Sequence, residues 1–286
     1  MAGSPASDSA EWLDLGGLLP AQSALLALLQ STCACLAEAG VPVWITGGTL
    51  LGAVRHGGFV PHDDDIDLEC REQHLAQVRE ALDGHSRLVF RLGGHWNSTR
   101  VGHVGLKDAS LELDLFLRED ELVELKDFPS AAEIFPLRHY DFHGLSVPGL
   151  ADPERFLGRL YGPSCLTTVK VWSHAFNNFH GLAHDPERVT LPLREYESMV
   201  AAAGYKPPGL LSEDPAEALA ALFLPGGAVQ ALCREREENW LVALQRRNRE
   251  QAEARLRLET TRRAGVGDSD NFAAAEGPAS RGGCAE

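Results

Sequence analysis

Carboxylates crowd one short segment of the sequence in a way that suggests chemistry. Residues 61–70 read PHDDDIDLEC, which places four aspartates within five positions between two apolar stretches. Like charges this close repel one another, and aspartate favours neither helices nor strands. A cation held among the carboxylates would offset the repulsion. The segment predicts a metal site, and an acidic surface loop or a cluster before a helix is the structural alternative.

Strand geometry divides these residues between two faces. If residues 63–69 form or approach a strand, the odd-numbered aspartates point one way while Ile66 and Leu68 anchor the other face in the core. Asp65 and Asp67 would then stand roughly 6–7 Å apart, close enough to reach one hard cation. We therefore predict these two as the principal ligands.

A calcium-binding EF-hand loop is the obvious rival for this spacing of aspartates. Starting the loop at Asp63 places Leu68 where glycine is required and His74 where the bidentate glutamate belongs. The sequence excludes that motif at both positions. Asp63 and Asp64 are expected to be outer or surface carboxylates.

Two neighbouring segments favour phosphate chemistry. Upstream, ITGGTLLGAVR places Gly47 and Gly48 between a strand and a helix, where backbone N–H groups can face a phosphate. Downstream, LELDLF places Glu112 and Asp114 on one face of a strand. A further carboxylate from a separate strand is what a two-metal phosphoryl-transfer site requires. Arg55 could bind phosphate or close the helix end in a salt bridge.

A family resemblance covers both sides of the aspartate cluster. The segment GGTLLGAVRHGGFVPHDDDIDLEC resembles the signature of the LicD family, which includes the fukutin-related proteins. The segment IFPLRHYDFHGLSVPGLADPERFLGRLYG is similar to the second block of that family. The resemblance implies an α+β fold of the nucleotidyltransferase-like, DNA polymerase β type, with a mixed sheet flanked by helices and a helical C-terminal extension. His62 stands where family members usually carry Trp.

The resemblance also implies an activity. It predicts a transferase that moves a phospho-headgroup, phosphocholine or an alditol phosphate, from a CDP-linked donor to a glycan or related hydroxyl acceptor. The expected cofactor is Mg²⁺, with Mn²⁺ as a substitute. By position in the motif, the donor phosphates would contact Gly47, Gly48, Thr49 and Arg55. The metal-binding and catalytic carboxylates would be Asp65, Asp67 and Asp114, with Glu112 as the second choice for the third position.

Two other functions remain open at this stage. The carboxylates and the glycine turn would serve equally well for nucleotidyl transfer from a nucleoside triphosphate to a small molecule, and pyrophosphate release would reveal that reaction. Outside the enzymes, the chain could be an inactive nucleotide-binding or interaction module. Nucleotide binding without turnover would reveal that role.

Hydrophobic patterns indicate the elements that would position these residues. A helix is expected from about residue 20 to 39, ended by Gly40. A short strand (VPVWIT), a helix after the glycine turn, a helix in REQHLAQVREAL and three strands between about residues 87 and 120 would follow. A looser region punctuated by prolines precedes a helix in DPERFLGRLYG. Beyond about residue 170 the pattern is mainly helical.

This pattern divides the chain into four predicted parts. They are a flexible lead-in (1–18), a LicD-type domain (19–190), a helical extension (191–263) that includes a charged helix at 226–263, and a disordered tail (264–286). His174, His180 and His184 match no zinc pattern and are expected as loop or substrate contacts. Trp172 and Phe176 are expected in core packing.

Composition limits the partners and the compartment. The chain has 286 residues and a net charge of −15, which disfavours nucleic acid and anionic membranes as partners. Its apolar N-terminal stretch is interrupted by polar residues, so we predict no membrane span. The six cysteines contain no C-x-x-C pair, which suits free thiols in a reducing compartment. A cytoplasmic location is expected, and the oligomeric state is left open.

Overall fold

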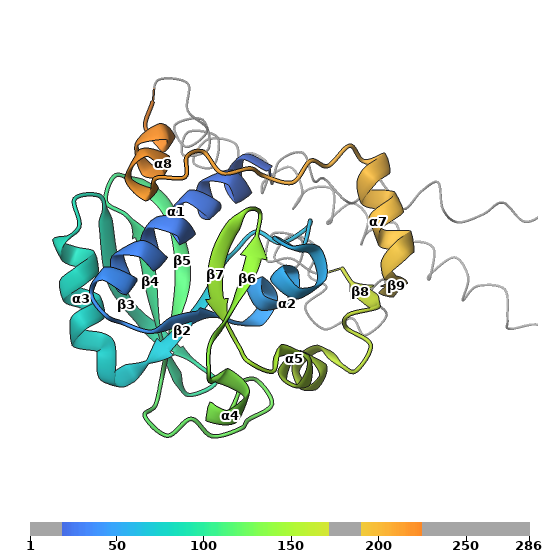
Figure 1. Ribbon diagram of the computed structural model, residues 1–286, viewed down its shortest axis with the longest axis horizontal. Helices are drawn as coiled ribbons and strands as arrows, with labels where there is room; N and C mark the ends of the chain where they lie inside the picture. Colours follow the sequence, from blue (N-terminus) through green and yellow to red (C-terminus); the bar gives the residue numbers. More distant parts are fainter. Residues whose placement is uncertain (1–18, 172–189, 225–286) are drawn as a thin grey trace, which may run out of the picture. The chain divides into compact units, whose positions relative to one another are not determined.

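A five-stranded mixed sheet lies at the centre of the computed structural model, which describes residues 19–171 and 190–224 (Figure 1). The spatial order of its strands is β1-β2-β5-β4-β3. Strands β2 and β5 are parallel, and the other neighbouring pairs are antiparallel. The strands are β1 (Val43–Ile45), β2 (Asp67–Arg71), β3 (Leu88–Trp96), β4 (Thr99–Leu106) and β5 (Ala109–Arg118). This mixed sheet with flanking helices confirms the predicted α+β class.

Helix α1 (Leu19–Glu38) supplies much of the core that supports the sheet. It packs against α3 (Leu75–Gly84), against α8 (Pro215–Leu222) and against β5. Its apolar residues are almost completely shielded from solvent, because Leu25, Leu28, Leu29 and Leu36 are at most 2% exposed. The helix ends beside Gly40, which adopts a φ of +68° as a helix-ending glycine commonly does.

Helix α2 (Gly47–His56) carries the predicted glycine turn and packs against β2, against β6 (Arg138–Phe142) and against α5 (Pro153–Tyr161). A short 3₁₀ turn, η1 (Glu72–His74), precedes α3. Strand β2 begins at Asp67, so the earlier aspartates lie on its approach. The predicted alternation still holds there, because Ile66 and Leu68 are both fully buried.

A β-hairpin occupies the region that we predicted to be loose, and that prediction is wrong. Strands β6 (Arg138–Phe142) and β7 (Leu145–Gly149) pair there, with Pro148 inside β7. Proline is tolerated because this ladder has only two strands, so one side of each strand needs no partner. A short helix, α4 (Ala131–Ile134), precedes the hairpin.

The hairpin turn joins the second family block to the first. His143, at a φ of +55°, donates its backbone N–H to the carbonyl oxygen of Gly57 (2.8 Å). Its Nε2 accepts a hydrogen bond of 2.8 Å from the backbone N–H of Phe59. A Cβ atom added at Gly58 would lie 2.2 Å from the His143 ring, so only glycine fits there. These contacts pack the two segments closely against each other.

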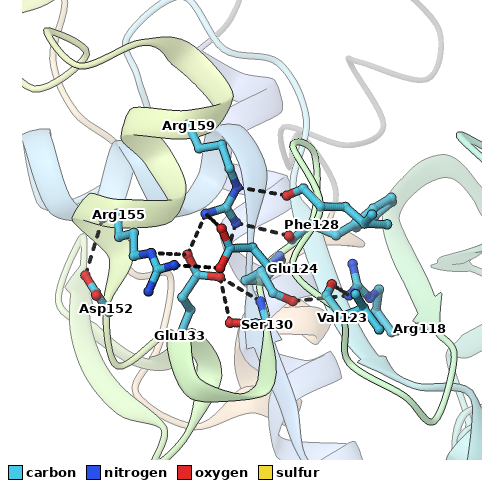
Figure 2. Close-up of polar contacts among 11 residues, drawn as sticks. Arg118, Val123, Glu124, Phe128, Ser130, Glu133, Asp152, Arg155 and Arg159 are labelled. Carbon is cyan, nitrogen blue, oxygen red and sulfur yellow. Dashed lines mark hydrogen bonds and ion pairs between the residues drawn. The ribbon is translucent and has the colours of Figure 1, made fainter.

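Ion pairs anchor the irregular segment between β5 and α5 (Figure 2). Glu133 is 1% exposed, lies 2.7 Å from Arg159 Nη1 and completes a capping box with Ser130. Arg118 donates to the carbonyl oxygens of Val123 and Pro129 at 3.1 Å each. These contacts hold the segment between β5 and α4 against the end of the central sheet.

The described chain after residue 165 contains two short strands as well as helices, whereas we predicted mainly helix beyond about residue 170. Strands β8 (Thr168–Lys170) and β9 (Thr190–Pro192) form a second two-stranded ladder, which precedes α7 (Leu193–Ala202). The predicted lead-in, the charged helix at 226–263, the tail and the candidate residues between 172 and 189 lie outside the described residues. The described residues all belong to one unit, residues 1–240, and the predicted domain boundaries stay predictions. None of the helices in the described ranges has the length and hydropathy needed to cross a membrane.

Candidate active site

A cavity of about 820 Å³ collects most of the predicted site residues. Its walls come from α2, from the approach to β2, from β3, β4 and β5, from α5 and from β8. The predicted residues that line it are Gly47, Gly48, Arg55, Asp65, Asp67 and Asp114. Residues far apart in the sequence therefore meet around one space, which is large enough for a small-molecule ligand.

The register of β2 and β5 brings two of the carboxylates together. Asp67 is directly opposite Asp114 in this parallel pair, and the Asp114 N–H donates to the carbonyl oxygen of Ile66 at 2.9 Å. Neighbouring strands are about 4.8 Å apart, so both side chains leave the sheet side by side. Asp65 lines the same cavity from the approach to β2.

The two glycines leave space for the carboxylates. Gly47 has a φ of +53°, and a Cβ atom there would lie 2.4 Å from Asp67 Oδ2. A Cβ atom on Gly48 would lie 2.9 Å from Asp63 Oδ2. The Gly48 N–H donates to Asp67 Oδ2 at 3.2 Å. The N-terminus of α2 therefore points at the Asp67 carboxylate, which its positive dipole end stabilises.

Thr49 supports Asp67 from outside the cavity lining. Its side chain is 2% exposed, it does not line the cavity, and its Oγ1 accepts a hydrogen bond from the Asp67 N–H at 2.8 Å. The Thr46 N–H also donates to the Asp67 carbonyl oxygen (3.1 Å). Thr49 thus positions the first residue of β2, and the phosphate contact expected of it stays a prediction.

The carboxylates create a strongly negative region. Burial, followed by repulsion from Asp65, raises the pKa of Asp63 well above its ordinary value. Burial also raises the pKa of Asp114, although the hydrogen bond from His103 opposes that rise. Asp63, which we expected at the periphery, is itself buried in the cavity wall. Such a region favours either a bound cation or a shared proton.

The donor atoms fit a hard divalent cation, since Mg²⁺ prefers carboxylate oxygens. Asp65, Asp67 and Asp114 offer such oxygens to a common space. Within residues 19–171 and 190–224, however, no three His, Cys, Asp or Glu side chains are arranged so that they could hold a metal ion together. The metal assignment therefore stays a prediction.

His103 is a cavity residue that sequence reasoning missed. It is opposite Asp114 across the β4–β5 pair, and its Nδ1 lies 2.8 Å from Asp114 Oδ1. The alternation in TRVGHVGL places His103 on one strand face, but only the register shows its partner. Glu112, the second choice for the third carboxylate, instead pairs with Arg91 at 3.3 Å and does not line the cavity.

Arg55 reaches the cavity and also holds its wall. Its Nη1 donates to the carbonyl oxygens of Cys165 (2.8 Å) and Thr168 (3.1 Å), and its Nε donates to His56 Nε2 (2.8 Å). These bonds tie α2 to β8 and to the chain before it. Burial lowers the pKa of Arg55, and burial and the Arg55 charge lower the pKa of His56 to about 4.

His62 belongs to a buried contact with α7. It is 7% exposed, lines the cavity, and its Nδ1 lies 2.7 Å from the Tyr196 hydroxyl. Tyr161 at the end of α5 also lines the cavity, and burial, followed by the charges of Asp67 and Asp63, raises its pKa well above its ordinary value. Both side chains form part of the cavity wall.

Comparison with known proteins gives the same family as the sequence motifs. Residues 40–149 match the family model described as LicD/FKTN/FKRP, nucleotidyltransferase domain. Human ribitol 5-phosphate transferase FKRP is 58% identical over 152 residues, which cover 46% of this chain and 30% of that protein. An uncharacterized protein of Rickettsia typhi is 31% identical over 144 residues, which cover 48% of this chain and 45% of that protein.

A more distant relative is mouse ribitol-5-phosphate transferase FKTN, 24% identical over 155 residues that cover 51% of this chain and 34% of that protein. The chain spans about half or less of the length of these relatives. The solved structure of ANT(2")-Ia with adenylyl-2"-tobramycin covers 68% of this chain and 94% of its own, but a TM-score of 0.33 at 15% identity is too weak to support a conclusion. The family match spans the glycine turn, the aspartates and the hairpin. Residues 40–149 are therefore similar to the nucleotidyltransferase domain of the LicD/FKTN/FKRP family.

Proposed function

We propose that this chain transfers an alditol phosphate, of the ribitol 5-phosphate type, from a CDP-linked donor to a glycan or related hydroxyl acceptor. The observation that carries the proposal is the convergence of Asp65, Asp67 and Asp114 on one cavity beside the N-terminus of α2. The family match supports it, as do relatives named as ribitol 5-phosphate transferases. The proposal includes a DNA polymerase β type of fold for the domain.

Three carboxylates would hold the cofactor in this proposal. Asp65, Asp67 and Asp114 are the proposed ligands of Mg²⁺, which when bound would neutralise the donor diphosphate. The remaining work falls to the chain itself. The Gly48 N–H and Thr49 Oγ1 fix the side chain and the backbone of Asp67, so its carboxylate needs little rearrangement when substrate arrives.

The proposed chemical step is an in-line displacement. The acceptor hydroxyl oxygen attacks the phosphorus that carries the alditol, the bond from that phosphorus to the bridging oxygen breaks, and CMP leaves. Asp114 takes the proton of the attacking hydroxyl. The hydrogen bond from His103 orients the Asp114 carboxylate in the cavity wall.

Calorimetry with the full chain tests this proposal. CDP, CMP, UTP and ATP are titrated in turn, with Mg²⁺ and then with EDTA, and CMP release from CDP-ribitol is followed with candidate acceptors. We expect metal-dependent binding of the cytidine nucleotides. Asp67→Asn should abolish CMP release while leaving the melting temperature nearly unchanged, and Asp120→Asn on the exposed loop after β5 serves as the matched control.

Three results would overturn the proposal. A preference for ATP or UTP with pyrophosphate release would identify nucleotidyl transfer. Binding of cytidine nucleotides without turnover would identify a binding module. An Asp67→Asn variant that unfolds would show that the aspartate is structural.

A further inference from the structure

The cavity continues from the carboxylates to a group of aromatic side chains that the proposed function does not use. Trp96, Phe116 and Phe128, here called the aromatic platform, line this end together with Asp127. We propose that the platform binds a pyranose ring of a neutral glycan, the acceptor in the reaction above. This inference rests on the proposed function, because it assigns the acceptor part of the same site.

The sheet places the platform next to the carboxylates. Asp114 and Phe116 are successive residues on one face of β5, so they stand roughly 6–7 Å apart along the strand. Their partners on β4 are His103 and Val101, which line the same cavity. One continuous sheet face thus leads from the carboxylates to Phe116, a separation of about one sugar ring.

The aromatic platform is held rigid before any ligand arrives. The Trp96 ring lies edge-to-face with Phe116 and with Phe128, at centroid distances of 5.7 Å each. The Arg118 guanidinium lies 4.4 Å from the Phe128 centroid and is itself fixed by a 3.2 Å ion pair with Glu69 (Figure 2 shows Arg118 beside Phe128). A fixed aromatic surface loses little conformational entropy when a ligand stacks on it.

Trp96 remains partly open to solvent despite this packing. The residue is 47% exposed, at the end of β3 where Asn97 and Ser98 turn the chain with positive φ angles. Asn97 Nδ2 donates to Asp127 Oδ2 at 2.9 Å, which places a carboxylate and an amide beside the indole. An exposed indole can cover the C–H face of a pyranose, while the carboxylate accepts hydrogen bonds from its hydroxyl groups.

The distribution of charged side chains indicates which end of the cavity suits the donor and which suits the acceptor. Among the described residues that line the cavity, the Arg and Lys side chains are Arg55 and Lys170, from α2 and β8. Helix α2 packs beside β2, whereas Trp96 is on β3, the strand at the far edge of the sheet from β1. A donor diphosphate is therefore favoured near α2 and β8, and the platform with Asp127 favours an uncharged ligand.

Ligand-observed NMR with the full chain tests the assignment without requiring transfer. The probes are the methyl glycosides of glucose, galactose, mannose, N-acetylglucosamine, N-acetylgalactosamine and xylose, with CMP as the donor-side probe. We expect at least one glycoside to receive saturation from aromatic protons. Trp96→Ala should weaken its binding about tenfold or more and Asp127→Asn about fivefold, while the affinity for CMP is unchanged.

Leu92→Ala is the matched control, because Leu92 is on the same strand, is 42% exposed and does not line the cavity. The platform assignment is overturned if no glycoside binds the folded wild-type protein, or if Trp96→Ala weakens CMP binding instead, which would identify a base-stacking surface. If glycoside binding depends on Trp96 but no CMP is released from CDP-ribitol, the platform assignment is supported and the proposed function is contradicted.

Discussion

At the scale of single residues, the glycines before α2 matter because of what lies next to them. Gly47 has a left-handed backbone, and its missing side chain leaves room for the Asp67 carboxylate. The neighbouring Gly48 N–H is the donor that holds this carboxylate. The turn therefore serves the aspartates first, and any phosphate would bind to a turn already engaged with Asp67.

Gly47→Ala should reduce both activity and stability. A Cβ atom 2.4 Å from Asp67 Oδ2 must displace the carboxylate, and an unfavourable φ costs a further ~1–3 kcal/mol. Steady-state CMP release and urea unfolding would measure the two effects. Gly84→Ala is the matched control, since nothing lies within 4 Å of a Cβ atom at that helical glycine. Equal rates of CMP release and equal stabilities for the two variants would contradict this role of Gly47.

His56 should make stability depend on pH in a defined window. In the folded protein its pKa is lowered from 6.5 to about 4, so between these values the unfolded chain holds a proton that the folded chain lacks. The contribution of His56 to the free energy of unfolding therefore decreases as the pH falls through this window, and His56 contributes nothing to the slope above it.

His56→Gln should remove that contribution to the slope. The amide oxygen of glutamine can still accept the hydrogen bond that Arg55 Nε donates at this position. Urea unfolding of both proteins at pH 7.5, 6 and 5 would show the wild type losing more stability than the variant on acidification. Parallel pH profiles would show that His56 titrates normally.

At the scale of elements, the network around Glu133 joins α4 to α5 (Figure 2). Burial alone would raise the pKa of Glu133, but hydrogen bonds from Arg159 and Ser130 outweigh it and the pKa is lowered. Arg159 also donates to the carbonyl oxygens of Leu125 and Phe128. The same network thus supports the segment that carries the Phe128 ring of the aromatic platform.

Glu133→Gln should destabilise the protein by about 3 kcal/mol, because it removes the charge that Arg159 pairs with in a nearly dry position. Arg155→Ala should cost less than about 1 kcal/mol, because the Arg155 side chain is 57% exposed, its partner Glu124 is 40% exposed, and its Nε lies as far as 3.7 Å from Glu133 Oε1. Urea midpoints at constant m-value would measure both. A larger loss of stability for Arg155→Ala than for Glu133→Gln would contradict this role of Glu133.

At the scale of the whole molecule, an acidic cavity sits in an acidic chain. The net charge is −15, and four aspartates line the cavity between residue 63 and residue 114. Burial, and after it repulsion from neighbouring carboxylates, raises the pKa of Asp63 and of Asp114 in the folded state. A ligand cation that binds only the folded state would relieve this repulsion and add stability.

Millimolar Mg²⁺ should therefore raise the melting temperature by several degrees relative to EDTA, and Mn²⁺ should act similarly. The double variant Asp65→Asn/Asp67→Asn should lose this response without melting earlier in EDTA, since it also removes repulsion. NaCl at matched ionic strength controls for general screening of the net charge. An equal response of the wild type and the variant would place the cation elsewhere.

The sequence by itself determined the features that depend on local pattern. A two-residue period placed Ile66 and Leu68 in the core with the odd-numbered aspartates facing the cavity, and the helix signals located α1, α2, α3 and α5. The family followed from two motif blocks, and the comparison confirms it. Such features can be read along the chain because periodicity, glycine and capping act over a few residues.

Only the tertiary structure decided which distant residues meet. The β2–β5–β4 register sets Asp67 beside Asp114 and Asp114 beside His103, while Glu112 turns to Arg91. Packing assigned Thr49 to the backbone of Asp67 and gathered the aromatic platform from three separate segments. Strand register and side-chain packing depend on the complementarity of surfaces far apart in the sequence, which no local pattern encodes.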